Sequence, residues 1–182
     1  MATNIAPHNM REVIAAARHL LANPSASSAD LMEFVPGPDL PSGGIIVGLD
    51  GIRDAYETGR GTFKTRARVS IESVAPRRLG IVVTQLPYGI GPEKVIEKIK
   101  EGVNNKKLQG ISDVSDLTDR SHGLRLIIEI KTGFDPQVVL DMLYRYTPME
   151  DSFGINNVAL VNGRPQTLGL RDMLGVYLAH RV

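Results

Sequence analysis

Residues 63–72, Phe63-Lys64-Thr65-Arg66-Ala67-Arg68-Val69-Ser70-Ile71-Glu72, carry the clearest period of two in the chain. Apolar or small side chains occupy the odd positions, and charged or polar ones occupy the even positions. Because successive side chains of a β-strand point to opposite faces, the pattern predicts a strand with one buried and one solvated face. Residues 76–80 then predict a turn, and residues 81–86 the partner strand that returns beside it.

The solvated face of this strand is basic. Lys64, Arg66 and Arg68 would follow one another ~7 Å apart along it, and Arg60 precedes them in a Gly-Arg-Gly turn. Between positions 53 and 78 the chain holds seven Lys or Arg against three Asp or Glu, although its net charge is only +1. Such a concentration of cations favours a polyanionic partner, and arginine forks suit phosphate oxygens. An ordinary solvated strand face is the alternative.

The flanking sequence predicts helices and strands in mixed order. Asn9 and Glu12 are typical of a helix start, as is Asp135-Pro136, and Asn162-Gly163 is typical of a hairpin turn. Helices are expected at 9–22, 28–34, 52–56, from 92, from 136 and at 170–182. A short buried strand is expected at 45–47, and further strands at 123–131 and 153–161. We therefore predict an α+β fold with a mostly antiparallel sheet of about four strands and packed helices. The final helix shows no stop signal, so we expect that the chain is truncated inside it.

Composition excludes several classes of protein. Apolar residues make up 42% of the chain, which is enough for a core and argues against disorder. The sequence has no run of 18 apolar residues and no basic-then-apolar leader, so we expect neither a membrane span nor a signal peptide. Cysteine is absent, which excludes disulfides and thiolate metal sites. A cytoplasmic location is expected.

Recognisable catalytic and metal motifs are missing from the sequence. Residues 43–48 lack the Lys-Ser/Thr of a phosphate loop, and no two histidines stand at ligand spacing. Asp113, Asp116 and Asp119 do not follow the spacing of a calcium loop and are expected in an exposed acidic turn. Ser121 and His122 lie too close to Asp119 in sequence for a hydrolase triad. No catalytic or metal residue is predicted, and His8 is expected either to bond locally or to meet a ligand.

Short motifs spread over the whole chain nevertheless resemble one family in order and spacing. They are residues 1–9 (MATNIAPHN), 36–39 (PGPD), 56–61 (YETGRG), 86–88 (LPY), 123–129 (GLRLIIE) and 152–156 (SFGIN). This set is similar to the A subunits of bacterial type IIA DNA topoisomerases, the family of DNA gyrase and topoisomerase IV. The resemblance covers both enzymes alike.

The resemblance implies that the chain is an internal piece, the tower or shoulder region. Residues 1–34 would join the upstream cleavage module, 35–168 would form the α+β tower, and 169–182 would begin the long coiled-coil helix. The tower cradles the arms of the cut duplex, which makes Arg60, Lys64, Arg66 and Arg68 its implied contacts to the DNA backbone. The implied partners, at the nucleoid, are double-stranded DNA, a B subunit, and a second A subunit.

The same resemblance implies that the reaction's groups lie elsewhere. The tyrosine that forms the phosphotyrosyl bond lies upstream of this stretch, and the partner B subunit uses ATP and Mg²⁺. Arg145-Tyr146-Thr147 imitates the family's active Arg-Tyr-Thr sequence, but Pro148 replaces the expected glutamate. We expect Tyr146 to pack in the core. Two other interpretations remain open: a standalone DNA-binding module, and a structural spacer between the cleavage module and the exit gate.

Overall fold

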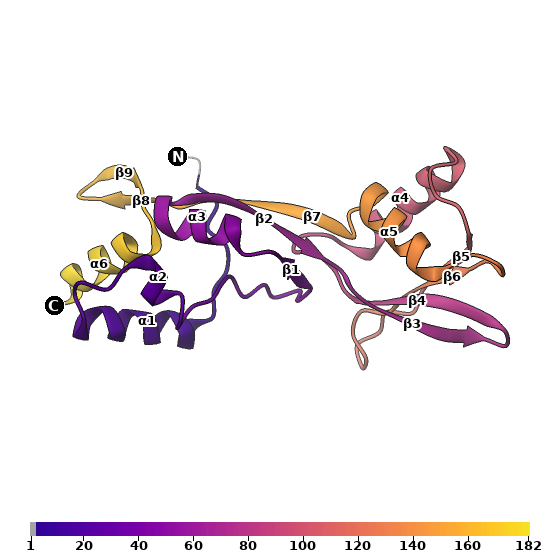
Figure 1. Ribbon diagram of the computed structural model, residues 1–182, viewed down its shortest axis with the longest axis horizontal. Helices are drawn as coiled ribbons and strands as arrows, with labels where there is room; N and C mark the ends of the chain where they lie inside the picture. Colours follow the sequence, from indigo (N-terminus) through magenta and orange to yellow (C-terminus); the bar gives the residue numbers. More distant parts are fainter. Residues whose placement is uncertain (1–2) are drawn as a thin grey trace. The chain divides into compact units, whose positions relative to one another are not determined.

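The computed structural model describes residues 3–182, which form two compact units, each with its own hydrophobic core. Of the described residues, unit 1 comprises those up to 41, 46–64 and 152–182, and unit 2 comprises 42–45 and 65–151. The helices are α1 (Met10–Ala22), α2 (Ser28–Leu31), α3 (Asp50–Thr58), α4 (Pro92–Asn104), α5 (Pro136–Tyr146) and α6 (Leu170–Arg181) (Figure 1). The strands are β1 (Ile45–Val47), β2 (Arg60–Arg66), β3 (Arg68–Ala75), β4 (Arg78–Gln85), β5 (Ile111–Asp116), β6 (Leu126–Ile130), β7 (Glu150–Asn156), β8 (Val158–Val161) and β9 (Arg164–Thr167).

Unit 2 contains the antiparallel sheet expected from the sequence. Its strand order is β3-β4-β6-β5, and every neighbouring pair is antiparallel. The apolar positions of β4 and β6 meet in register, since Ile81 lies opposite Ile128 and Val83 opposite Leu126. These side chains are fully buried and pack with the apolar stripes of α4 and α5. The α+β fold with packed helices is confirmed.

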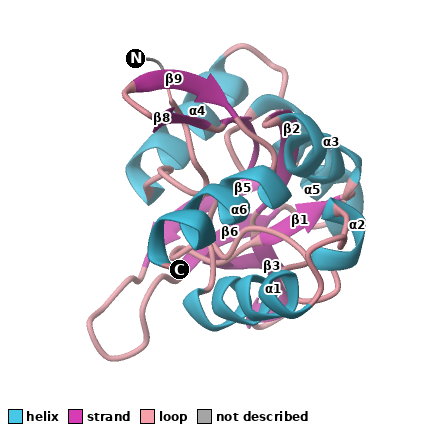
Figure 2. Ribbon diagram, turned by 90° about the vertical axis from the view of Figure 1, so that its left-hand side faces the viewer, coloured by secondary structure: helices cyan, strands magenta, loops and turns pink. Residues whose placement is uncertain are grey.

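Unit 1 is built mainly of helices. Asn9 caps α1 by accepting the N–H groups of Arg11 and Glu12, at 3.0 and 3.4 Å. The reciprocal capping pair lies instead at α2, between Ser27 and Asp30. Helix α6 lies beside α1, as Figure 2 also shows, and the apolar faces of α1, α2, α3 and α6 share one core.

The long alternating stretch forms two strands, because the chain changes hydrogen-bonding partner at Ala67. The Ala67 N–H donates to Met149 O (2.7 Å), whereas Arg68 pairs with Gln85 of β4. The expected alternation of burial holds through 63–70, but Ile71 was expected to be buried and is 42% exposed. Its strand, β3, is the edge strand of the sheet, which explains this exposure.

Three further expectations are corrected. Strand β1 was expected to be buried, but Ile45 and Val47 are exposed because β1 lies at the edge of the sheet β1-β2-β7. The predicted strand 153–161 divides at Asn157, whose backbone bonds to Gly59 O and to the Leu168 N–H instead of continuing a ladder. The expected acidic turn at 113–119 is largely strand β5, because its backbone pairs with β6.

The hairpin predicted at Asn162-Gly163 is present. The two residues have φ angles of 50° and 77° and join β8 to β9 in antiparallel register. Asparagine and glycine are the residues that tolerate this left-handed conformation. The functional division into 1–34, 35–168 and 169–182 concerns a longer protein and stays a prediction.

Candidate nucleic-acid interface

The Thr58-Gly59-Arg60-Gly61 turn is fixed by its own hydrogen bonds. Gly59 ends α3 in the left-handed conformation (φ 84°), and its N–H donates to Ala55 O at 2.8 Å. The Thr58 hydroxyl donates to Asp54 O (2.8 Å) and accepts the Arg60 N–H (3.2 Å). Arg60, the first residue of β2, therefore has a fixed backbone and an exposed side chain.

The glycines of this turn pack against protein. A Cβ on Gly61 would lie 2.0 Å from Gly51 O, and one on Gly59 would lie 2.7 Å from Leu168 O. Both neighbours are backbone atoms of unit 1. The close approach that glycine permits here is used to pack β2 against α3 and to seat the segment before α6.

In unit 1, β2 presents the expected cationic face. Arg60, Thr62 and Lys64 are exposed, while Phe63 between them is 3% exposed and stacks on Phe153 with ring centres 5.4 Å apart. Within residues 3–182, Arg60 forms no ion pair. The alternation of the sequence thus places two cations on the surface of unit 1.

In unit 2, Arg66 is held by two groups that the sequence did not reveal. Its Nε donates to Glu150 Oε2 at 2.5 Å, and its guanidinium lies 4.8 Å from the centre of the Tyr144 ring. Burial raises the pKa of Tyr144, and the Arg66 charge opposes that rise. Any phosphate that binds Arg66 must compete with the Glu150 carboxylate. Glu150 is 84 residues away from Arg66 in sequence, so no local pattern could have paired them.

Arg68 is tied to a neighbouring strand. Its Nε donates to Gln85 Oε1 at 3.1 Å, and the same oxygen accepts the Gly44 N–H at 2.8 Å. Gln85 thus joins Arg68 to the loop before β1, although Arg68 itself remains exposed and has no carboxylate partner within 3–182. The four predicted cations divide between the units, with Arg60 and Lys64 in unit 1 and Arg66 and Arg68 in unit 2. Their contact with DNA stays a prediction.

The Asp119, Ser121 and His122 cluster does not have the geometry of a hydrolase triad. The Asp119 carboxylate accepts the Ser121 N–H (2.8 Å) and faces His122 Nδ1 (2.9 Å) in an exposed loop. The serine contributes its backbone to this contact, so the three residue types do not form a nucleophile, base and acid in line. Within residues 3–182, no group of three or more histidine or carboxylate side chains is placed to hold a metal ion.

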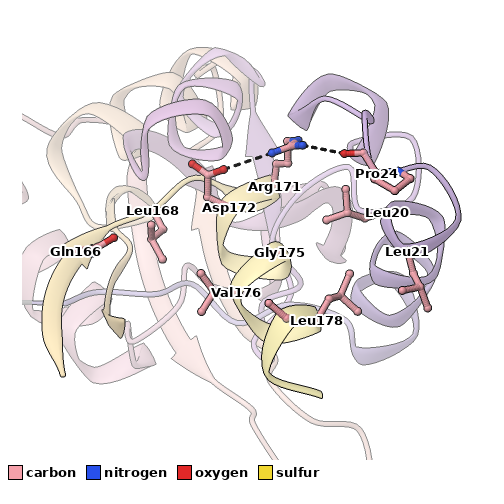
Figure 3. Close-up of a pocket in the computed structure, with 11 residues that line it drawn as sticks. Leu20, Leu21, Pro24, Gln166, Leu168, Arg171, Asp172, Gly175, Val176 and Leu178 are labelled. Atoms are coloured by element: carbon pink, nitrogen blue, oxygen red, sulfur yellow. Dashed lines mark hydrogen bonds and ion pairs between the residues drawn. The ribbon is translucent and has the colours of Figure 1, made fainter. Parts of the chain in front are cut away.

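A groove of about 610 Å³ lies in unit 1 between the end of α1 and α6. Its walls are mainly apolar side chains, among them Leu20, Val176 and Leu178 (Figure 3). Its two charged residues are engaged with the protein, since Arg171 Nη2 donates to Pro24 O at 2.8 Å and Arg171 Nη1 lies 3.7 Å from Asp172. The groove therefore resembles a packing surface more than a reaction site.

Comparison with known proteins gives this arrangement its context. The family of the DNA gyrase/topoisomerase IV A subunits matches residues 1–182, the whole chain. The chain belongs to that family. The DNA gyrase A subunits of the Staphylococcus aureus strains MRSA252, NCTC 8325 and COL are each 46% identical to it over 181 residues. The alignment covers 100% of this chain and 20% of each relative, so this A-subunit chain spans about a fifth of their length.

Two observations complete the description of this A-subunit chain. In the described part of the chain, 3–182, no helix is both long and apolar enough to cross a membrane. Tyr146, expected in the core, is half-buried and packs against the edge of the unit 2 core, beneath Lys107 and Arg145.

Proposed function

We propose that this chain is the tower region of the A subunit of an ATP-dependent type II DNA topoisomerase. It would support the cleaved duplex during passage of a second duplex and contribute no catalytic residue of its own. The observation that carries the proposal is the family match over all 182 residues, at 46% identity to gyrase A subunits. The partners would be double-stranded DNA, a second A subunit, and a B subunit that uses ATP and Mg²⁺, in the cytoplasm at the nucleoid.

The proposed DNA surface is the cationic run Arg60, Lys64, Arg66 and Arg68. Arg60 supports it most directly, because it is exposed on a fixed turn and forms no ion pair within 3–182. Contacts from such side chains reach phosphates, so they would position a duplex without reading its sequence. Bending 20–30 bp by 40–90° costs about 1–6 kcal/mol, and tower cations would offset part of that cost.

A structural spacer is the second candidate. It is favoured by the internal contacts of unit 2, where Arg66 is bound by Glu150 and Tyr144 and Arg68 by Gln85. In that role the cations would stabilise the fold between the cleavage module and the exit gate, and DNA would not touch them.

Binding of the chain to a duplex of ~30 bp across a salt series separates the two functions. Each lost phosphate contact flattens the log–log slope by about 0.9, so Arg60→Ala/Lys64→Ala should lose about 1.8. Arg66→Ala/Arg68→Ala should lose a similar amount if those side chains leave their internal partners for DNA. The matched control is Arg11→Ala/Arg18→Ala, which removes two exposed cations from α1 of unit 1.

The outcomes assign the function. The tower interface is supported if both double variants of the cationic run bind more weakly and with a flatter salt slope while the control is unchanged. Loss in the first variant alone restricts the interface to unit 1. Equal binding by all variants, or no binding by the wild type, leaves the spacer as the better description.

A further inference from the structure

We propose that unit 2 carries a second phosphate-binding surface, the Tyr146 patch, formed by Lys106, Lys107 and Arg145 around the Tyr146 ring. Its ligand would be the backbone of duplex DNA, so this inference rests on the proposed function. It adds a DNA contact outside the cationic run. Lys107 Nζ lies 5.9 Å and the Arg145 guanidinium 5.5 Å from the centre of the ring. Cations at this distance are attracted to the electron-rich face of an aromatic ring.

In the described part of the chain, the cations of the patch have no carboxylate within ion-pair distance. Within residues 3–182, neither Lys106, Lys107 nor Arg145 forms an ion pair, and all three are exposed. The acidic residues that precede these cations on α4 and α5 bond within their own helices. Glu101 pairs with Lys98 at 2.7 Å, and the Asp141 carboxylate accepts from Gln137 Nε2 at 3.2 Å.

A neighbouring tyrosine shows the contrast. Tyr144 also lies beneath a cation, but that cation is Arg66, and Glu150 neutralises it. Two residues further on, Tyr146 holds two cations that lack a carboxylate within 3–182. The charge of Arg66 at Tyr144 is balanced by Glu150, whereas the cations at Tyr146 can still bind an anion.

The backbone that carries the lysines is rigid. Lys107 N–H and Leu108 N–H both donate to Gly102 O, at 2.8 and 3.0 Å, and Leu108 is 2% exposed. A Cβ on Gly102 would lie 2.6 Å from Leu108 Cδ1, so the glycine makes room for this leucine. The turn after α4 is therefore anchored in the unit 2 core, and the adjacent lysines point from a fixed base.

Lys106 occupies a conformation that lysine does not favour. Its φ is 58°, in the left-handed region that glycine and asparagine adopt with least strain at the end of a helix. Asn104 and Asn105 stand immediately before it, yet the lysine takes this position. The helix-ending turn accounts for this conformation, because Lys106 N–H donates to Val103 O (3.1 Å) and Lys107 N–H to Gly102 O (2.8 Å), which fixes where both lysines leave the helix.

The exposed position of the three cations indicates the class of ligand. The three cations lie on the outer surface of the turn after α4 and the end of α5, where an extended polyanion reaches all of them. Because cations already lie over the Tyr146 ring, its role is to position them and not to stack on a base. A phosphate backbone meets both conditions, and an acidic polypeptide is the alternative that the experiment must exclude.

The test is salt-dependent binding of the chain to the same ~30 bp duplex. Lys107→Ala/Arg145→Ala should flatten the log–log slope by about 1.8 and weaken binding at low salt by well over tenfold. Arg120→Ala, which removes an exposed cation from the β5–β6 loop of unit 2, is the control and should bind like the wild type. Thermal unfolding of each variant checks that unit 2 remains folded.

Two further variants test how the patch is built. Tyr146→Phe keeps the ring and should bind like the wild type, whereas Tyr146→Leu should bind about threefold more weakly with little change in slope. Lys106→Gly should raise the unfolding temperature, because it relieves the positive φ, and should still flatten the slope by about 0.9. A purely structural lysine would give the stabilisation without the loss of binding.

The outcomes separate this inference from the proposed function. If Lys107→Ala/Arg145→Ala binds like the wild type while Arg60→Ala/Lys64→Ala loses affinity, the patch is overturned and the β2 interface stands. The reverse result supports the patch and removes the β2 interface. Absence of wild-type binding overturns both. Binding of poly-glutamate at these residues in preference to the duplex overturns the patch alone.

Discussion

At the scale of single residues, the contact between His8 and Tyr56 links the N-terminal segment to α3. His8 Nδ1 lies 2.8 Å from Ala6 O, and a carbonyl only accepts, so Nδ1 carries the proton. In the neutral imidazole the other nitrogen, Nε2, then accepts from the Tyr56 hydroxyl at 2.7 Å. Tyr56 is 2% exposed, and its burial, followed by the charge of Glu12, raises the pKa of its phenol well above the usual value of 10.0.

This raised pKa predicts a loss of stability in alkali. The folded phenol holds its proton at a pH where the unfolded one releases it, so the contribution is complete below pH 10 and is lost as the pH rises above it. One retained proton corresponds to a fall of about 1.4 kcal/mol per pH unit in the free energy of unfolding. Tyr56→Phe should be less stable at pH 7, by about 1 kcal/mol for the lost hydrogen bond, yet decline less steeply from pH 10 to 12.

Urea unfolding at a series of pH values measures both slopes. Parallel curves for Tyr56→Phe and the wild type would contradict the assignment. The sequence predicted a local bond or a ligand for His8, and one of its two bonds is local. Its tyrosine partner is 48 residues away and could not be predicted, because only the folded chain brings the two side chains together.

At the scale of elements, the packing of α3 on β2 depends on two glycines. A Cβ on Gly51 would lie 1.8 Å from Thr62 O, and one on Gly61 would lie 2.0 Å from Gly51 O. These atoms belong to the backbone, so the clash cannot be relieved by turning a side chain. The helix and strand approach closely only because neither residue has a side chain.

Gly61→Ala should therefore destabilise unit 1 by about 3 kcal/mol or more, as overpacking forces the two backbones apart. Gly175→Ala is the matched control, because Gly175 lies within α6 and has no heavy atom within 4 Å of the added Cβ. That substitution should stabilise the protein by about 0.5–1 kcal/mol. Equal unfolding midpoints for the two variants in urea would show that the α3–β2 contact is looser than the structure indicates.

Local signals predicted many elements and missed their interruptions. Asp135 accepts the Gln137 N–H at the start of α5, where the sequence placed a cap, and α4 begins at Pro92 as expected. The alternation through Ala67 gave no sign that the strand divides there, since the cause is a hydrogen bond to Met149, 82 residues further along the chain. The period of two shows which face of a strand is buried. That pattern stays the same when the strand changes its hydrogen-bonding partner.

At the scale of the whole molecule, the sequence predicted the fold class but not the two cores. The core of unit 1 combines the N-terminal helices with Phe63, Ile155 and Leu174, and the core of unit 2 uses only residues between 67 and 149. An apolar pattern shows that a side chain is buried and does not show with which others. The candidate site was predictable to the same extent. The concentration of charge identified the cationic run, but not Glu150 and Gln85, which bind part of it from distant positions in the sequence.

Two separate cores predict two separable responses to a cavity. Ile52 in unit 1 and Ile128 in unit 2 are both fully buried, so Ile52→Val and Ile128→Val remove the same methylene from different cores. Each should cost about 1 kcal/mol, which accelerates amide exchange about fivefold where the affected unit opens. We expect Ile128→Val to accelerate exchange in β4 and β6 and leave α1 and α3 unchanged, and Ile52→Val to do the opposite. Hydrogen exchange followed by mass spectrometry resolves these segments. Equal acceleration in both units by either variant would mean that the chain unfolds as one cooperative body, in which case the binding variants of either unit must be compared at equal stability.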